Sequence, residues 1–494
     1  MCLGMFMAIL DIQIVASSLP EIQAAFDIPL DRLSWVQTAF LIAEVVAIPL
    51  TARLTRLMSL RGLFVSAVAG FTLASVGCAL SHDFATLILF RTIQGFCGGI
   101  VIPAVFTAGY VLFPIGRRIL PTTIAGVFAM MAPTLGPVVG GYITETYSWH
   151  WLFLINLGPG LFVLPIVACL VRIGRPNWRL LPHLDYIGVA LMALGLGSLE
   201  ILLKEGPKHD WSGSHVFIPL AFVLLGGGGA IRRCFDRSDP IVELHLLGNR
   251  AFALSCVYSF VLGMGLYASV YLLPLFLGLV REHTPLEIGE IMIVCGVAQL
   301  FIAPLAAAAE RRLDARILTA AGYALFAVGL LINGFATYET DFNGLFWPQI
   351  LRGAGMMLCL LPTTTIALGR HTGDMLANAS ALFNLMRNLG GAIGISLVDT
   401  ILERRPLVHV AELVARLQAG DADAARIVGL PVDKFHGVAM GPVDEATKQA
   451  IATLVERAAL VISFNEAWLV FGAVFVVAAL ATPLIPRIDP RRLG

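Results

Sequence analysis

Long apolar runs recur along the chain at short intervals. Each holds about 20 residues, the length that an α-helix needs to cross the ~30 Å hydrocarbon core of a bilayer. The pattern therefore predicts fourteen transmembrane helices, at approximately 1–19, 33–52, 62–80, 85–112, 118–143, 150–172, 185–204, 213–231, 251–278, 285–309, 316–336, 344–369, 378–401 and 465–486. One such run could be a buried helix of a soluble protein, but a dozen of them exclude that class.

Residues 403–463 form the single long polar stretch. Apolar residues recur in it at helical spacing in two groups: Leu407, Val410, Leu413, Val414 and Leu417, and then Ile451, Leu454, Val455 and Ala458. We predict two amphipathic helices in the periplasm, separated by residues 420–441. The segment is either a solvated cap or a surface on which a partner protein docks.

Composition agrees with a membrane protein. Hydrophobic residues make up 58% of the chain and charged residues 13%, whereas soluble domains carry about a quarter charged residues. The first apolar run lacks the charged start of a cleavable signal, so we expect a retained helix. The net charge of zero gives no indication of nucleic-acid binding, and the eight cysteines show no metal-ligand spacing.

Lysine and arginine near helix ends stay on the cytoplasmic side of a membrane. With the first helix starting in the cytoplasm, 19 of the 33 Lys and Arg fall in cytoplasmic connections or the C-terminal tail, and four fall in short outward loops. We therefore predict a multi-pass protein of the bacterial inner membrane with both termini in the cytoplasm.

A weak internal repeat predicts two related halves. Arg91 is followed by Pro103, and Arg352 is followed by Pro362. The next helix of each half carries a glycine cluster: Gly136, Gly140 and Gly141 in the first half, and Gly390, Gly391 and Gly394 in the second. Duplicated halves around a site at mid-membrane are a transporter design, although glycine-rich helices also resemble one another by chance. The expected organisation is a six-helix bundle at 1–172, two inserted helices within 173–250, and a second six-helix bundle at 251–494.

Ionisable residues inside membrane helices cost at least about 2.5–3.5 kcal/mol each, so each is a functional candidate. They are Asp11, Glu44, Arg91, Glu200, Glu290, Arg352, Arg387 and Asp399. Arginine keeps its proton at physiological pH, so proton cycling must use the carboxylates.

Asp11, Arg91 and Glu44 are the predicted proton-coupling residues. In a dry cavity Asp11 would favour its protonated form, and an approaching cation would favour ionisation, which is the switch that antiport needs. The structural alternative is a permanent ion pair between Asp11 and Arg91 that locks their helices together. Glu44 could be a second acid or a ligand for cationic substrates.

Polar side chains of the predicted membrane helices are assigned to a substrate cavity: Gln13, Gln37, Gln94, Asn384 and Arg387. Asp399 lies near the outer end of its helix and is expected to be solvated. In the stretch 132–141, Pro133 and Pro137 remove two backbone donors, and Gly136, Gly140 and Gly141 permit close helix approach. This stretch is either ordinary small-residue packing or a hinge and seal.

These motifs resemble the fourteen-helix drug:proton antiporter branch of the major facilitator superfamily, over essentially the whole chain. The segment Leu10 to Pro20 is similar to the family's first-helix motif, with departures at Gln13 and Ser17. Arg91, Gln94 and Gly95 match its motif B, and Gly136 to Gly141 matches its antiporter motif. The segment Trp149 to Asn156 also resembles the family. The connection 52–61 departs from the family pattern, because Arg56 replaces an acidic residue and both glycines are missing; the usual cytoplasmic latch is not expected here.

The resemblance implies an all-α membrane protein of the major facilitator fold that exports small amphiphilic compounds such as drugs, dyes, uncouplers or weak acids. It implies a proton gradient as the driving force, no cofactor and no metal, and a periplasmic adaptor with an outer-membrane channel as partners. A Gly-Lys-Ser/Thr phosphate loop is missing from the sequence, which disfavours ATP as a driver. The alternatives are a proton symporter or facilitator for a metabolite and, from another class, a membrane receptor or membrane-embedded enzyme.

Overall fold

The computed structural model describes residues 1–16, 19–28, 35–114, 117–171, 174–237, 240–369, 371–432 and 445–486, and all regular structure in these ranges is helical. The helices of the first part are α1 (Cys2–Ala16), α2 (Leu19–Phe26), α4 (Trp35–Ala79), α5 (Phe84–Leu112), α6 (Ile119–Thr146), α7 (His150–Leu154) and α8 (Leu157–Leu170). The middle part holds α9 (Tyr186–Lys208), α10 (Ser214–Phe222) and α11 (Gly228–Asp236). The last part holds α12 (Arg250–Leu279), α13 (Pro285–Glu310), α14 (Ala315–Asn333), α15 (Phe342–Leu368), α16 (Gly373–Gln418), α17 (Ala422–Val428) and α18 (Glu445–Ala481).

Eleven helices of the described residues are long and apolar enough to cross a membrane, and the count is twelve if the bent α6 is one span. The apolar part of α1, Cys2–Val15, is shorter. The chain is therefore a multi-pass membrane protein. The difference from the fourteen predicted spans lies in α1 and in α4, which covers both predicted helices 33–52 and 62–80.

The helix α4 reverses direction in its middle. Ser59 has a φ of 65° and a ψ of 159°, which no α-helix accommodates. In the first half the facing pairs are Phe40 with Gly95 and Glu44 with Gly99 of α5. In the second half they are Gly70 with Cys97 and Gly77 with Phe90. In the first half of α4 the residue numbers of the facing pairs increase in the same direction along α4 and α5, so these segments are parallel. In the second half they increase in opposite directions, so these segments are antiparallel. The two halves of α4 therefore run antiparallel to each other.

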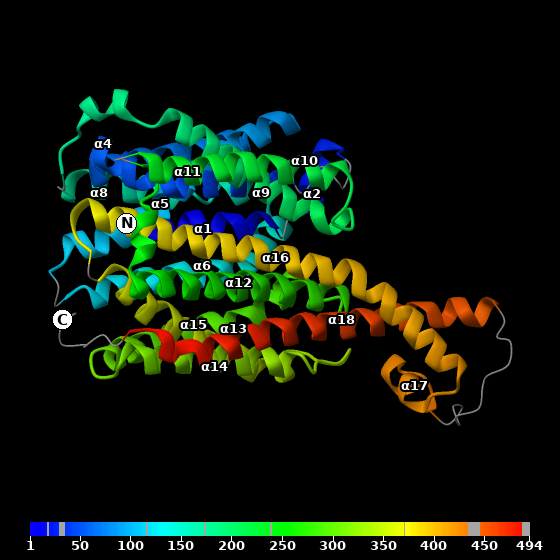
Figure 1. Ribbon diagram of the computed structural model, residues 1–494. Coiled ribbons are helices and arrows are strands. Elements are labelled where there is room, and N and C mark those ends of the chain that lie inside the picture. Colours follow the sequence, from blue (N-terminus) through cyan, green and yellow to red (C-terminus); the bar gives the residue numbers. More distant parts are fainter. Residues whose placement is uncertain are drawn as a thin grey trace.

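Most helices run roughly parallel to one another (Figure 1), and two large apolar cores hold them together. The N-terminal core is built mainly from α1, α4, α5, α6 and α8, and the C-terminal core from α12 to α15, α16 and α18. Residues of α12 and α16, such as Phe252 and Phe383, belong to the N-terminal core, so the two cores join directly. Lipid-facing positions are apolar as well, with Leu73, Phe301 and Leu480 each more than 70% exposed.

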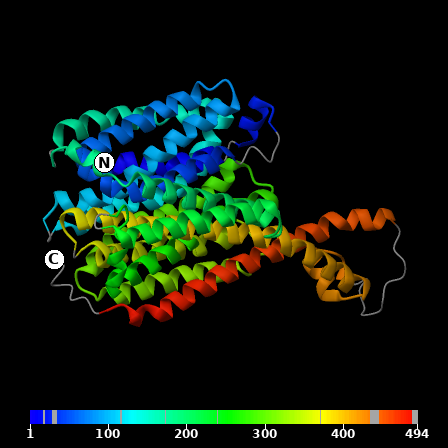
Figure 2. The same cartoon turned by 45° about the horizontal axis from the view of Figure 1, so that its top comes forward.

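An arm projects from one end of the helix bundle, where α16 and α18 continue beyond the other helices and α17 packs between them (Figures 1 and 2). The arm has its own small core of Leu413, Leu417, Ala424, Ala425, Val428, Val455, Ala458 and Ala459. At its base Arg405 donates two hydrogen bonds, of 2.6 and 2.5 Å, to Glu466. The predicted helix ends at 401 and 465 were wrong, because the amphipathic groups lie on extensions of the membrane helices.

Candidate functional site

A buried polar cluster joins four helices of the N-terminal core around Asp11. The Asp11 carboxylate accepts a 2.5 Å hydrogen bond from Arg91, one of 3.0 Å from Gln94 and one of 2.6 Å from Asn156. Gln94 and Asn156 also donate to Ser75, at 2.8 and 3.2 Å. All five side chains are at most 2% exposed. These contacts tie α1 to α4, α5 and the start of α8.

Arg91 is held from its other sides too. Its Nε donates to the Val36 carbonyl at 3.0 Å, and its guanidinium lies 4.5 Å from the centre of the Phe40 ring. Both carboxylate oxygens of Asp11 are occupied, and none of the described pockets reaches the pair. This geometry favours the interpretation of Asp11 and Arg91 as a lock between helices, while proton coupling at Asp11 stays a prediction.

A second polar cluster lies where the two cores meet, and we call it the inter-core cluster. It consists of Glu44 from α4, Glu200 from α9, and Asn384, Arg387 and Asn388 from α16. Glu44 is 2% exposed and lies near Asn388, with Arg387 and Glu200 within electrostatic reach. Arg387 donates to Asn384, and its Nη1 has no hydrogen-bond partner among the described residues. Ionisable groups from both cores and the inserted helices thus meet in one buried place.

Close backbone contacts fix the position of this cluster. A Cβ at Gly390 would lie 2.0 Å from the Phe260 carbonyl oxygen, so only glycine lets α16 approach α12 this closely. Ser380 of α16 donates to the Pro103 carbonyl of α5 at 3.1 Å, which links the two cores. The Arg387 guanidinium lies 5.5 Å from the ring centre of Phe106.

The structure separates the residues predicted to line one cavity. Asn384 and Arg387 lie in the inter-core cluster, whereas Gln94 lies in the Asp11 cluster. Gln37 donates to the Ile12 carbonyl at 3.5 Å, and Gln13 packs against α6. Both are only partly buried.

The stretch 132–141 lies in α6, whose two segments Leu120–Pro133 and Val138–Thr146 meet at an angle of 49°. Gly136 packs against Gln13 of α1, and a Cβ there would lie 2.3 Å from that side chain. Across the inter-core surface, Gly289 of α13 packs against Val138. Pro133, Gly136, Gly140 and Gly141 are buried, and the side chain of Pro137 lies outside the described residues. The stretch therefore lies between its own core and the opposite one.

The remaining charged residues of the membrane helices differ widely in environment. Glu290 is exposed on the outside of α13. Asp399 accepts a 2.8 Å hydrogen bond from Tyr271 and is only partly buried. Arg352 is 2% exposed and donates to Gln349 at 2.8 Å. Among the described residues no group of three or more His, Cys, Asp or Glu could hold a metal ion.

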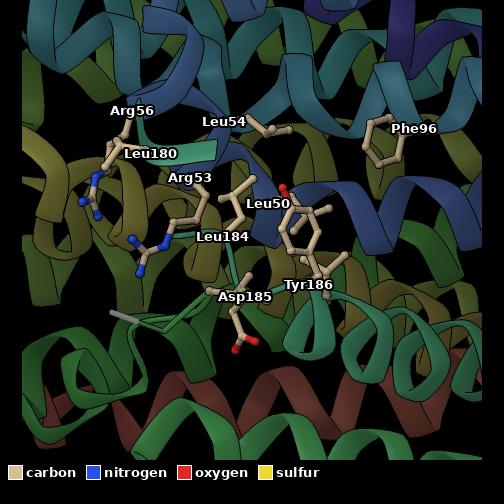
Figure 3. Close-up of a pocket in the computed structure, with 11 residues that line it drawn as sticks. Leu50, Arg53, Leu54, Arg56, Phe96, Leu180, Leu184, Asp185 and Tyr186 are labelled. Carbon is tan, nitrogen blue, oxygen red and sulfur yellow. The ribbon is translucent and has the colours of Figure 1, made fainter. Parts of the chain in front are cut away.

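A pocket of about 210 Å³ lies apart from both clusters, between the end of the first half of α4 and the start of α9 (Figure 3). Arg53 on its wall donates to the Pro240 carbonyl at 3.0 Å. Asp185 accepts from Arg233 at 2.7 Å and from the Gly188 backbone at 3.0 Å. Burial raises the pKa of Asp185, but these hydrogen bonds outweigh it and leave the pKa below its ordinary value. The contacts fasten this end of the inserted helices to the N-terminal core.

Sequence reasoning missed the roles of Ser75 and Asn156, which complete the Asp11 cluster. Ser75 carries no signal, because a serine in an apolar helix usually bonds its own backbone, as Ser75 also does with the Phe71 carbonyl. Asn156 stands at the end of the stretch Trp149 to Asn156, and its amide could have been read as a partner for a buried charge. Glu200 was noted as ionisable but not placed beside Glu44.

Comparison with known proteins gives a consistent picture. The family profile described as Major Facilitator Superfamily matches residues 1–395. The chain is 40% identical to the colistin resistance protein EmrB of Acinetobacter baumannii over 84% of this chain and 81% of that one. It is 29% identical to the multidrug export protein EmrB of Escherichia coli and to the fatty acid resistance protein FarB of Neisseria gonorrhoeae, each over 96% of this chain and 92% of the relative.

Solved structures agree on the fold. The proton:xylose symporter XylE aligns with a TM-score of 0.59 at 13% identity, over 99% of this chain and 95% of that one. The human organic anion transporter MFSD10 aligns with a TM-score of 0.56 at 13% identity, over 96% of this chain and 97% of that one. At such identities the likeness concerns the fold alone.

Proposed function

Because the chain belongs to the major facilitator superfamily, we propose that it is a proton-driven antiporter that exports small amphiphilic compounds across the bacterial inner membrane. The inter-core cluster carries this proposal. A carboxylate, Glu44 of α4, and an arginine, Arg387 of α16, come from the two proposed bundles and meet where an alternating-access transporter must open and close. The relatives named for multidrug export, colistin resistance and fatty acid resistance support amphiphilic substrates.

The proposed architecture has fourteen spans. Residues 1–172 and 251–494 form two pseudo-symmetric six-helix bundles, and 173–250 contributes two inserted spans. The reversal of α4 at Ser59 supports two spans in that helix, and α1 with the bent α6 supplies two more. The distribution of Lys and Arg supports cytoplasmic termini and, with them, a periplasmic arm.

In the proposed cycle Glu44 binds the proton. A buried ionised carboxylate is costly unless a cation or hydrogen-bond donors satisfy it, so movement of Arg387 and Asn388 relative to Glu44 changes its proton affinity. Opening between the two bundles changes that distance, because Glu44 and Arg387 belong to different bundles. The ion pair of Asp11 with Arg91 keeps the N-terminal bundle rigid. Alternatively, Asp11 binds the transported proton in place of Glu44. The stretch 132–141, at the contact of α6 with α13, is the proposed hinge and seal.

The test is transport in proteoliposomes with an imposed pH gradient and a panel of cationic, neutral and anionic drugs. Export requires substrate movement against the proton flow, and Glu44→Gln should remove the response to the gradient, with Glu290→Gln as the exposed control. Substrate movement in the same direction as the protons would identify the alternative, a metabolite symporter. Transport that ignores the gradient would contradict proton coupling altogether.

We further propose that the arm docks a periplasmic adaptor that leads to an outer-membrane channel. Leu413 and Val455 are buried in the arm's own core, so they are not available to a partner. Leu407 is 73% exposed, Val408 50% and Leu454 38%, so these side chains supply the apolar contact.

Deletion of residues 407–460 tests the docking proposal. The cut ends lie close together, because Arg405 and Glu466 are hydrogen-bonded at the arm base. Transport in proteoliposomes should persist, while whole-cell resistance and co-purification of the adaptor are lost. A smaller variant, Leu407→Ser with Leu454→Ser, should weaken adaptor binding and leave the arm folded. Unchanged adaptor binding in the deletion would contradict docking and favour a lid.

A further inference from the structure

The inserted helix α9 lies between the two bundles rather than on the outside of one. A Cβ at Gly197 would lie 3.3 Å from Ile42 of α4, which is close packing against the N-terminal bundle. On the other side, the Leu203 carbonyl accepts a 2.8 Å hydrogen bond from Ser396 of α16. Just beyond the end of α9, Trp211 donates to Thr400 at 3.2 Å. The helix therefore contacts both moving parts of the proposed transporter.

Glu200 stands between these two contacts along α9. It is 9% exposed, which is unusual for a carboxylate on a helix that has a lipid-facing side. It lies one turn after Gly197, which packs against Ile42, and Glu44 lies two residues after Ile42 and within electrostatic reach of Glu200. Two inserted helices can pack without a buried acid at this position, so we interpret Glu200 as a functional residue.

Neither carboxylate is paired directly with a cation in the described part of the chain. Arg387 of α16 is within electrostatic reach of Glu44, and Arg91 of α5 is already paired with Asp11. Tyr267 of α12 reaches the same cluster, with its hydroxyl 3.4 Å from Asn388. On α9 itself Lys204 lies one turn further on, with its Nζ 4.5 Å from the ring centre of Trp35. Because Glu44 and Glu200 are both buried, each would lack a direct counter-charge if it were ionised.

We propose that Glu200 is a second proton-binding residue of the transport site, so that the inserted helices form part of the transport machinery. A buried ionised carboxylate without a direct ion-pair partner is too costly in a dry site, so the charge of Glu200 must be met by a proton or by the cationic group of a substrate. Proton and organic monocation then compete for one place: the proton leaves the carboxyl oxygen as the cation arrives, and the net charge of the site is unchanged. This inference rests on the proposed function.

The experiment uses the full-length protein in detergent and in proteoliposomes, with tetraphenylphosphonium as the monocation probe. Wild type should release protons into a weakly buffered solution on binding the probe. Glu200→Gln should reduce the protons released per bound probe by about half or more and flatten the pH dependence of probe affinity. Glu200→Asp should restore both, and Glu290→Gln, which alters an exposed carboxylate on α13, should match wild type.

The outcomes distinguish this inference from the proposed function. If wild type responds to the pH gradient and Glu200→Gln releases as many protons as Glu290→Gln, the acid of α9 is structural and the inference fails. The monocation argument fails if wild type transports neutral drugs but does not bind the probe. An absence of gradient-driven transport in wild type would instead overturn the proposed function.

Discussion

The two halves of the molecule each bury an arginine, and the two arginines have different partners. Arg91 of α5 is paired with Asp11 and lies in a network that also includes Gln94, Ser75 and Asn156, although its Nη2 has no hydrogen-bond partner among the described residues. Arg352 of α15 has one hydrogen bond, to Gln349, and its Nε has no partner among the described residues. The first half thus neutralises its buried charge, and the second leaves it unpaired.

The neighbours of Arg352 show the same incompleteness. The Oε1 atom of Gln299 and both amide atoms of Asn333 are buried without partners in the described part of the chain. Close packing of the α14 and α15 backbones stabilises this half, because a Cβ at Gly355 would lie 2.8 Å from the Gly322 carbonyl oxygen. A polar network with few unsatisfied groups makes a region rigid, whereas a larger number of them lowers its stability. We therefore expect the first half to be the more rigid one and the second half to have more conformational freedom.

The strongest way to break this comparison is to remove each arginine. Arg91→Met leaves the Asp11 carboxylate buried without a counter-charge, which costs about 3–5 kcal/mol, so we expect a large loss of monodisperse protein and of thermal stability in detergent. Arg352→Met removes a charge with no carboxylate partner and should leave stability unchanged or raised. Equal losses in the two variants would show that the arginines play the same role.

Asp11→Asn tests the function of the Asp11 network. Asparagine keeps the size of the side chain and an oxygen for Gln94 and Asn156 but removes the counter-charge of Arg91, so we expect reduced stability and, in the protein that folds, loss of proton-coupled export. The measurement is a substrate gradient built by a pH gradient in proteoliposomes, with Asp399→Asn as the control. If the variant still builds the substrate gradient, Asp11 is only a structural partner of Arg91, and Glu44 or Glu200 binds the transported proton.

The all-helical membrane fold could be predicted from the sequence, but this asymmetry could not. Apolar runs mark where membrane helices lie, and the pairing of Asp11 with Arg91 was one of two interpretations available, because each charge needs a partner at membrane depth. The partners Ser75 and Asn156 come from other helices, and nothing local to either residue fixes which charge they meet. The ends of the helices that form the arm were predicted wrongly for a related reason. Hydropathy indicates where a helix leaves the bilayer, whereas α16 and α18 continue beyond that point. The place of Glu200 depends on the packing of α9 against both halves, which no periodicity encodes.

If the first half is rigid, movement must occur where it meets the second, at α6 and α13. Gly140→Leu adds a bulky side chain in the stretch that makes this contact, so transport should stop while the protein remains in the membrane. Gly158→Leu on α8 is the matched control, because a Cβ there meets nothing within 4 Å. The measurement is proteoliposome transport normalised to inserted protein. Wild-type rates in Gly140→Leu would place the moving surface elsewhere.

The smallest effect, and the sharpest test of the difference between the two networks, comes from a pair of glutamines. Gln94 donates to Asp11 and Ser75 and accepts from Arg91, so Gln94→Met strands several buried groups and should cost about 1–3 kcal/mol. Gln299 donates only to sulfur atoms, of Cys295 and Met356, which are weak acceptors. Gln299→Met has a similar volume and loses little, so its stability should stay within about 0.5 kcal/mol of wild type. Both are measured as shifts in thermal unfolding of the detergent-solubilised protein. A cost at Gln299 as large as that at Gln94 would mean that the second half has a polar network as complete as the first, and that Arg352 is satisfied in the folded protein after all.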